Sequence, residues 1–230
     1  MTPMSHGGQY YANNLSANRL KKCYELAPRR VRQYLEAEIR CVLERVGPND
    51  RVLELGCGYG RVLERIATRS RMCVGIDTSF ANIALARTRA SGKRSFYFVA
   101  DATSPALCES VFDLVICIQN GISAFGVDPT RLLTQSLRVT RPDGAVLLSS
   151  YADAFWTDRL EWFRLQADEG LIGKIDDQRT GNGTIVCVDG FESRTFTPAD
   201  FQRIADGLGV CPKFKEIDES SVFCELQRSA

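Results

Sequence analysis

The stretch RVLELGCGYGRV at residues 51–62 constrains the fold of this chain more than any other. A short, mostly apolar strand precedes three glycines in the pattern G-x-G-x-G, and an apolar helical pattern follows them. A strand that reverses into a helix within a few residues needs backbone angles that are open mainly to glycine. The first turn of such a helix offers unpaired N–H groups to a polar or negatively charged ligand. The stretch therefore predicts a buried strand, a ligand-binding turn and a helix.

Glycine spacing and Glu54 together distinguish between two nucleotide-like ligands. A nicotinamide dinucleotide site prefers G-x-G-x-x-G, whereas this loop reads G-x-G-x-G. Glu54 lies two residues before the first glycine, where a carboxylate would repel a pyrophosphate and attract an ammonium group. S-adenosylmethionine carries an ammonium group and a positively charged sulfonium. The loop therefore favours S-adenosylmethionine as the cofactor.

The length and charge of the chain argue against several classes of function. A chain of 230 residues can bury one sizeable core, with room for a small accessory lobe. The formal net charge of +1 gives no case for DNA or an anionic membrane as a partner. No apolar run reaches the length of a membrane span, and Met1 to Gln9 lack a signal-peptide core. We therefore expect a cytoplasmic protein.

Cysteine is frequent in this chain and histidine is rare. The nine cysteines are scattered through the predicted strands and helices, with no C-x-x-C pair. This favours reduced thiols in the cytosol, most of them packed as small apolar side chains. No His/Cys/Asp cluster has the spacing of metal ligands, and the single histidine is His6. We therefore expect no metal site, and a histidine general base is not favoured.

Strand and helix patterns alternate as far as residue 150. Besides the strand before the glycines, the expected strands are 72–76, 96–99, 111–118 and 145–149, and the expected helices are 15–27, 28–46, 61–68, 81–89 and 129–140. Residues 141–144 have the composition of a turn. This order predicts a parallel sheet with right-handed crossovers.

After residue 150 the pattern changes. The elements expected there are an aromatic-rich helix at 155–167, a hairpin of 184–188 and 191–196, a capped helix at 197–208, and an antiparallel strand pair of 213–218 and 221–226. The hairpin is predicted from Asp189-Gly190, which favours a tight turn. The last two strands would close the sheet.

Two predicted strands end in a carboxylate. Asp77 lies about 20 residues past the first glycine, where an α/β nucleotide site places an acidic residue on the ribose hydroxyls. Asp101 follows the next strand and could read the adenine amino group. Each also has a structural interpretation, since Asp77 could cap a helix and Asp101 could stabilise a turn.

Polar amides follow the fourth predicted strand. Gln119 and Asn120 come directly after an apolar run that ends at Ile118. Ligands of open α/β folds bind at the carboxyl ends of the strands. We therefore expect these amides to face the bound molecules.

Residues 1–14 are polar and glycine-containing, and we expect them to be mobile in the free protein. Tyr10 and Tyr11 stand out within them. The tyrosine pair could pin this arm to the core, or Tyr11 could act as a lid over the active site. The sequence leaves both interpretations open.

Five motifs occur in the order found in one family. They are VLELGCGYG at 52–60, GIDTS at 75–79, FVADA at 98–102, FDLVICIQ at 112–119 and RPDGAVLLSS at 141–150. In this order the chain resembles the class I S-adenosylmethionine-dependent methyltransferases, of the small-molecule type. The resemblance implies a Rossmann-like α/β fold with a seven-stranded mixed sheet, in which one strand is antiparallel and helices cover both faces.

The resemblance also implies one methyltransferase domain over residues 1–230. Residues 1–47 would form an N-terminal helical lid, and 48–150 the cofactor-binding half. Residues 151–196 would be a lid insertion with a hairpin, and 197–230 the final helix and strand pair.

Roles for the cofactor site follow from the resemblance. The residues that it assigns to the methionine moiety are Glu54, Gly56, Cys57, Gly58 and Gly60. Those that it assigns to the ribose, the adenine and the surroundings of the transferable methyl are Asp77, Thr78, Asp101, Ala102, Ile118 and Gln119. The product would be S-adenosylhomocysteine.

For the acceptor, the resemblance points to the lid. Tyr11, Asn120 and Tyr151 are the candidate catalytic residues, because their amide and hydroxyl groups could orient a polar acceptor. Trp156 and Trp162 are further candidates for the pocket, and each could equally be a packing residue of the lid. Methyl transfer needs a base only where the nucleophile arrives protonated.

Several functions remain open at this point. The Asn-Pro-Pro-Tyr motif of DNA adenine and protein glutamine methylation is absent, since Gln119-Asn120-Gly121-Ile122 stands in its place. We expect a small-molecule acceptor that is methylated on N, O or S, and a monomer or homodimer. An RNA-modifying methyltransferase and a non-catalytic cofactor-binding subunit are the alternatives, and a nicotinamide oxidoreductase fits the loop less well.

Overall fold

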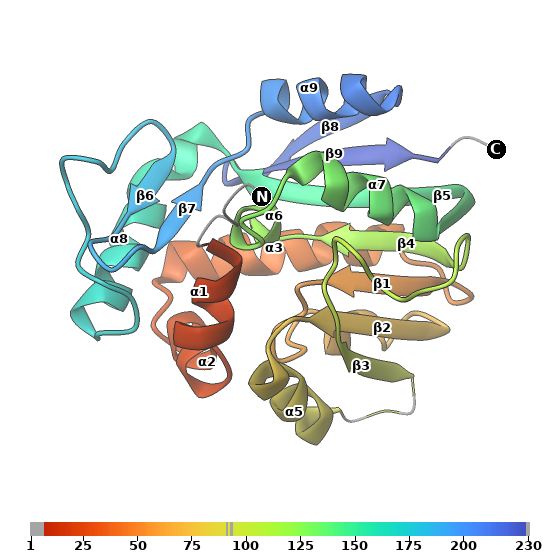
Figure 1. Cartoon of the computed structure of the whole chain (residues 1–230), viewed down its shortest axis with the longest axis horizontal. Coiled ribbons are helices and arrows are strands. Elements are labelled where there is room, and N and C mark those ends of the chain that lie inside the picture. Colours follow the sequence, from red (N-terminus) through yellow and green to blue (C-terminus); the bar gives the residue numbers. More distant parts are fainter. Residues whose placement is uncertain (1–6, 91, 93, 229–230) are drawn as a thin grey trace.

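The computed structural model describes residues 7–90, 92 and 94–228. A seven-stranded sheet with the order β3-β2-β1-β4-β5-β9-β8 runs through the centre (Figure 1). Its strands are β1 (Arg51–Leu55), β2 (Met72–Asp77), β3 (Ser95–Val99), β4 (Phe112–Cys117), β5 (Thr140–Tyr151), β8 (Pro212–Ile217) and β9 (Ser221–Gln227). The strand β9 runs antiparallel to both of its neighbours, β5 and β8, and is the one antiparallel strand of this sheet, as predicted.

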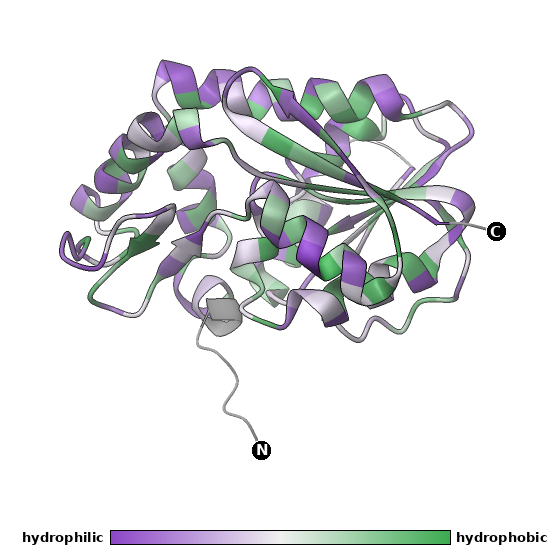
Figure 2. Ribbon diagram, turned by 90° about the horizontal axis from the view of Figure 1, so that it is seen from above, coloured by the Kyte–Doolittle hydropathy of each residue, from purple (hydrophilic) through white to green (hydrophobic). Residues whose placement is uncertain are grey.

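Helices cover both faces of the sheet. The helices α3 (Arg29–Arg45), α4 (Leu63–Ile66) and α5 (Phe80–Arg89) share one buried apolar cluster with β1 and β2. On the other face lie α6 (Gly121–Ala124), α7 (Pro129–Val139) and α9 (Pro198–Leu208). Figure 2 shows apolar strands between helices of mixed hydropathy. The sheet is therefore buried on both faces, which explains why its strands alternate poorly in sequence.

A third apolar cluster, which we call the lid, lies beyond the carboxyl ends of the strands (Figure 1). Its elements are α1 (Gly7–Asn14), α2 (Asn18–Glu25), the 3₁₀ turn Asp153–Phe155, α8 (Trp156–Asp168), β6 (Thr184–Val186) and β7 (Glu192–Arg194). The strands β6 and β7 form the predicted hairpin. The prediction of a mobile arm is wrong for residues 7–14, because Tyr10 is buried against Phe191 and donates a hydrogen bond to Asp189. His6 lies outside the described residues.

Two further boundaries differ from those expected. Of the helix predicted at 61–68, only α4 is helical in the structure, and turns occupy the residues on either side of it. Residues 141–144 are not a free turn but part of β5, which pairs with β4 through a register shift between Phe112 and Leu114. Local turn composition could not reveal this pairing, since it depends on a neighbouring strand.

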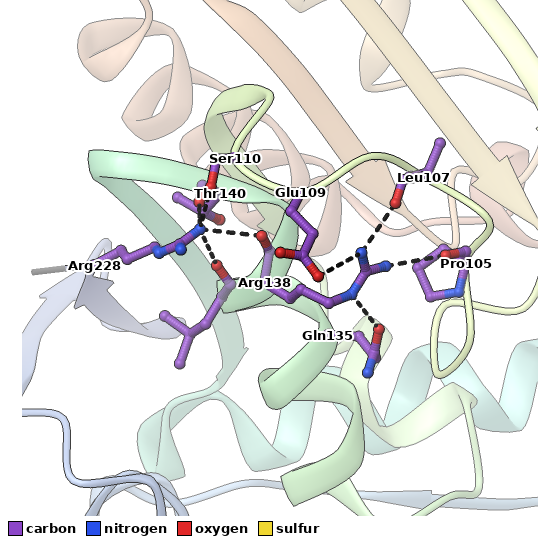
Figure 3. Close-up of polar contacts among 9 residues, drawn as sticks. Pro105, Leu107, Glu109, Ser110, Gln135, Arg138, Thr140 and Arg228 are labelled. Carbon is purple, nitrogen blue, oxygen red and sulfur yellow. Dashed lines mark hydrogen bonds and ion pairs between the residues drawn. The ribbon is translucent and has the colours of Figure 1, made fainter. Parts of the chain in front are cut away.

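The crossover from β3 to β4, residues 100–111, contains no helix. Arg138 of α7 holds it, since Nη1 donates to Leu107 O at 3.0 Å and Nη2 to Pro105 O at 3.1 Å (Figure 3). Arg228 donates in the same region to Ser110 Oγ at 3.0 Å. Arginine side chains therefore replace the packing that a crossover helix would supply.

Candidate active site

The glycine loop follows β1 at the carboxyl end of the sheet. Gly56, Gly58 and Gly60 all have positive φ, at 69°, 52° and 80°. A Cβ at Gly60 would lie 2.6 Å from Tyr97 Oη, so a side chain cannot fit there. Each of the three glycines is thus required by backbone conformation, and one also by close packing.

Asp77 is fixed against this loop by hydrogen bonds. Its Oδ2 accepts the Gly58 N–H at 2.9 Å, and its Oδ1 accepts the Ser79 N–H at 2.8 Å. The side chain of Asn82 also donates to Oδ1 at 3.2 Å. Burial raises the pKa of Asp77, while these three donors lower it. The carboxylate therefore joins the ends of β1 and β2 in a defined orientation.

Glu54 is a buried carboxylate with an unsatisfied oxygen. Its side chain is 5% exposed, and Oε2 has no hydrogen-bond partner. Burial raises the pKa of Glu54 to about 8, with a lowering effect from Arg61 and a further raising effect from Asp77. An unpaired buried carboxylate is costly, and a ligand that supplies a cation would compensate it.

The backbone bends sharply after β4. Gln119 and Asn120 both have left-handed backbone conformations, with φ of 57° and 58°. The Asn120 side chain accepts a hydrogen bond from Ser150 Oγ at 2.7 Å and donates to Ser193 Oγ at 3.4 Å. Gln119 Oε1 accepts a hydrogen bond from Arg61. Hydrogen bonds to residues of β5, β7 and the glycine loop thus hold the side-chain amides of Gln119 and Asn120 in place.

One cavity of about 460 Å³ joins the glycine loop to the lid. This volume lies within the range of about 300–1,000 Å³ that is typical of small-molecule sites. Its lid wall is largely aromatic, with Tyr11, Tyr24, Tyr151, Trp162 and Phe163. Desolvation raises the pKa of Tyr151 to about 12, and that of Tyr11 also lies above the usual value. Both hydroxyls are therefore neutral hydrogen-bonding groups at ordinary pH.

Most residues predicted for the site line this cavity. They are Tyr11, Glu54, Gly56, Cys57, Gly58, Asp77, Thr78, Asp101, Ile118, Gln119, Asn120, Tyr151 and Trp162. Gly60 packs against Tyr97 behind the loop, and Ala102 lies in the core. Trp156 lines a separate cavity of about 280 Å³ on the other side of Tyr151. The Asp101 carboxylate also accepts hydrogen bonds from Thr103, which supports its turn interpretation, whereas its contact with adenine stays a prediction.

The sequence interpretation missed several residues of the cavity wall. Arg61 lies with its guanidinium 4.3 Å from the centre of the Tyr24 ring, and Gln166 is a buried amide whose Nε2 has no partner. Phe125, which directly follows α6, and Ser193 of β7 also line the cavity. The buried residues of α8 lie at helical spacing; they are Arg159, Trp162, Phe163 and Gln166. Only the aromatic content of this helix was recognised in the sequence.

The described part of the chain holds neither a cluster of metal ligands nor a membrane-spanning helix. Within residues 7–90, 92 and 94–228, no group of three His, Cys, Asp or Glu side chains is arranged to hold a metal ion. Among the same residues, no helix has both the length and the apolar character needed to cross a membrane.

Comparison with known proteins identifies the central segment. Residues 52–144 match the family described as methyltransferase domain. A ubiquinone biosynthesis O-methyltransferase of Pseudomonas fluorescens is 33% identical over 113 residues, which are 46% of this chain and 47% of the relative. The chain thus spans less than half the length of this curated relative.

Solved structures resemble the whole chain. The [4+2]-cyclase SpnF has a TM-score of 0.70 and 14% identity, with 99% of this chain and 96% of that chain covered. Magnesium protoporphyrin IX methyltransferase from Synechocystis, with bound S-adenosylhomocysteine, has a TM-score of 0.62 and 16% identity, with 96% and 97% covered. At these identities the likeness shows the fold alone. Residues 52–144 therefore match a methyltransferase domain, and the chain as a whole has the fold of these solved structures.

Proposed function

We propose that the chain transfers a methyl group from S-adenosylmethionine to a small molecule in the 460 Å³ cavity. The observation that carries this proposal is Glu54, a buried carboxylate with an unpaired oxygen in the cavity wall. An amino-acid ammonium group would pair with it, whereas a dinucleotide pyrophosphate would be repelled. The residues present therefore fit the cofactor of the family.

The remaining cofactor contacts follow from the same placement. Asp77 would accept the ribose hydroxyls, and its existing N–H donors keep it oriented for that purpose. Thr78, Asp101 and the backbone of Ala102 would border the adenine. The glycine loop would lie against the methionine moiety, since no side chain keeps a ligand from its backbone.

Acceptor placement is the main task left to the protein. The bound cofactor supplies a methyl group that is already activated by a positively charged sulfur. Ile118 and Gln119 would border that methyl, and Asn120, Tyr11 and Tyr151 would orient the acceptor. Holding two reacting atoms in line and in contact can supply much of a rate enhancement. Tyr151 would act as a neutral hydrogen-bonding group, because its pKa of about 12 disfavours the phenolate.

The acceptor would be a small molecule with a nucleophilic oxygen, nitrogen or sulfur. The name of the Pseudomonas relative favours oxygen among these three. The aromatic lid wall suits a ring-bearing acceptor, and the net charge of +1 offers no general attraction for RNA. The protein would act as a monomer or a homodimer.

Calorimetry with the wild type and Asp77→Ala tests the cofactor site. We expect S-adenosylmethionine and S-adenosylhomocysteine to bind the wild type, and NAD not to bind. Loss of charge-assisted ribose hydrogen bonds should cost about 2–4 kcal/mol in Asp77→Ala. Asp206→Ala on the outer surface of α9 is the matched control and should bind normally. A folded wild type that binds NAD and no adenosyl ligand would contradict the proposal.

A second function is compatible with this fold. SpnF is described as a cyclase, so this fold also carries chemistry other than methyl transfer. A screen with a methyl donor labelled in the methyl group separates the two functions. Label transferred to an acceptor supports the methyltransferase, whereas cofactor binding with an acceptor converted but unlabelled would favour the alternative.

A further inference from the structure

Glu38 is a buried carboxylate that plays no part in the site described above. It lies in the middle of α3, is 0% exposed and does not line the cavity. Its Oε2 accepts hydrogen bonds from the Gln119 N–H at 2.6 Å and from Ser149 Oγ at 2.7 Å. Its Oε1 accepts a short hydrogen bond from Ser221 Oγ. One side chain thus joins α3 to the ends of β4 and β5 and to β9.

The segment that Glu38 holds has an uncommon backbone conformation for non-glycine residues. Gln119 and Asn120 are consecutive non-glycine residues with φ of 57° and 58°. Such conformations are sparsely populated and persist only where the surroundings impose them. Ser149 Oγ lies 2.8 Å from the same Gln119 nitrogen, so the amide is enclosed by two acceptors. Loss of the carboxylate would leave Ser149 Oγ as the remaining acceptor of this N–H, and would also remove the acceptor of the Ser149 hydroxyl.

We propose that Glu38 is a positioning residue, whose carboxylate fixes Gln119 and Asn120 in the left-handed conformation that presents the acceptor to the methyl group. This inference rests on the proposed function, because Gln119 borders the methyl group and Asn120 orients the acceptor only in that proposal. Glu38 acts through the Gln119 N–H and touches neither cofactor nor acceptor.

Three donors converge on Glu38, which suits the ionised form, since a carboxylate only accepts hydrogen bonds. Burial raises the pKa of Glu38 to about 7, and the bonds from Ser221, Ser149 and Gln119 lower it. Its titratable neighbours have pKa values above their usual ranges; they are Tyr34 and Cys41 on α3, Cys117 at the end of β4 and Tyr151 at the end of β5. Glu38 is therefore the group in this cluster that titrates near neutral pH. Protonation of Glu38 at lower pH should therefore weaken the hydrogen bond that the Gln119 backbone N–H donates to it.

The first experiment reads the Gln119 amide directly by NMR. Protein labelled with ¹⁵N-glutamine is loaded with S-adenosylhomocysteine and titrated from pH 5.5 to 9. We expect the Gln119 proton to move downfield with one inflection near pH 7, and to stay flat in Glu38→Gln. Glu36→Gln is the matched control, because Glu36 lies on the same helix but pairs with Arg65 at the surface. It should titrate as the wild type does.

Steady-state kinetics provide the second readout, with an acceptor found in the labelled-methyl screen. We expect Glu38→Gln to lower kcat at least tenfold and to leave the Kd for S-adenosylhomocysteine within twofold. The wild-type kcat should fall below pH 7, and this fall should be absent in Glu38→Gln. Glu38→Asp should recover part of kcat, since it restores an ionisable acceptor.

Each outcome separates this inference from the proposed function. Cofactor binding with a Gln119 amide that does not titrate in the wild type would overturn the inference and leave the function standing. A Glu38→Gln enzyme with unchanged kcat and pH profile would do the same. If Glu38→Gln does not fold, the wild-type titration decides, together with Ser221→Ala, which removes one donor and should move the inflection upward.

Discussion

Glu54 combines two properties that ordinarily exclude each other at one residue. It is buried, and it has an oxygen without a hydrogen-bond partner. Burial favours the neutral acid, and the pKa of about 8 means that Glu54 is mostly protonated at pH 7 in the free protein. A ligand ammonium group would reverse this preference, because a nearby positive charge favours the carboxylate.

Cofactor binding at pH 7 should therefore release a proton from Glu54. Affinity for S-adenosylhomocysteine should rise with pH between 6 and about 8, and level off above the free-protein pKa. Calorimetry at pH 7 in two buffers of different ionisation enthalpy measures the proton directly. We expect unequal binding enthalpies for the wild type and equal enthalpies for Glu54→Gln. Equal enthalpies for both would show that Glu54 does not change its ionisation.

Among single residues, the sequence predicted those whose roles depend on the local backbone structure around them. The three glycines and Asp77 follow from a strand that ends in a tight turn, so their spacing is visible in the chain. Glu38 and Gln166 could not be predicted this way. Each looks like an ordinary polar helix residue, and only the packing of distant elements buries it. Burial of a polar group is a tertiary property that helical spacing does not encode.

At the scale of elements, arginine side chains hold the β3–β4 crossover, and Arg138 makes more hydrogen bonds to it than Arg131 or Arg228. Arg138 donates to two carbonyls of this segment and to Gln135, and it lies within 3.8 Å of Glu109 (Figure 3). Without a helix in residues 100–111, these bonds have no substitute from regular structure. The crossover also carries Asp101, which lines the cavity.

Arg138→Met should therefore lower the free energy of unfolding by about 2 kcal/mol, since it removes charged hydrogen bonds and leaves carbonyls unpaired. Arg164→Met is the matched control, because Arg164 pairs with Asp177 at the surface, where the two side chains are 58% and 74% exposed. It should change the free energy of unfolding by less than about 0.5 kcal/mol. Urea unfolding of both variants measures the difference, and equal losses would contradict the role given to Arg138.

The boundaries of the elements show where the sequence pattern does not determine the structure. Apart from β5, which begins at Thr140 and not at Ala145, the strands of the sheet were predicted to within about one residue, because apolar runs between turns are strong signals. The α1 helix was missed, since its stability comes from contacts of Tyr10 and Tyr11 with Phe191, far along the chain. Short helices derive little stability from propensity and depend on such packing.

At the scale of the whole molecule, the parallel pairing of the first five strands was predicted from the alternation of strands and helices, whereas the order of the strands in the sheet was not. Right-handed crossovers leave few topologies for such a chain, and the antiparallel β9 fits between β5 and β8. The closing of the lid over the carboxyl ends was less predictable. It depends on one apolar cluster drawn from α1, α2, α3, α8 and the hairpin, which lie far apart in sequence.

The same packing divides the nine cysteines into classes of reactivity. Six are buried, Cys41 is half-buried, and Cys108 and Cys211 are exposed. Burial raises the pKa of the Cys73 and Cys224 thiols to about 12, so these side chains stay protonated as well as inaccessible. Thiol reactivity requires both an accessible sulfur and a thiolate.

We expect a colorimetric disulfide reagent to modify two thiols of the native protein quickly, Cys41 slowly, and the other six only after unfolding. The double variant Cys108→Ser/Cys211→Ser should lose the fast phase and keep its melting temperature, because neither side chain is part of the core. In denaturant the wild type should show nine reactive thiols and the double variant seven. Fast modification of four or more thiols in a protein with native circular dichroism would mean that the sheet opens far more readily than its two-sided burial implies.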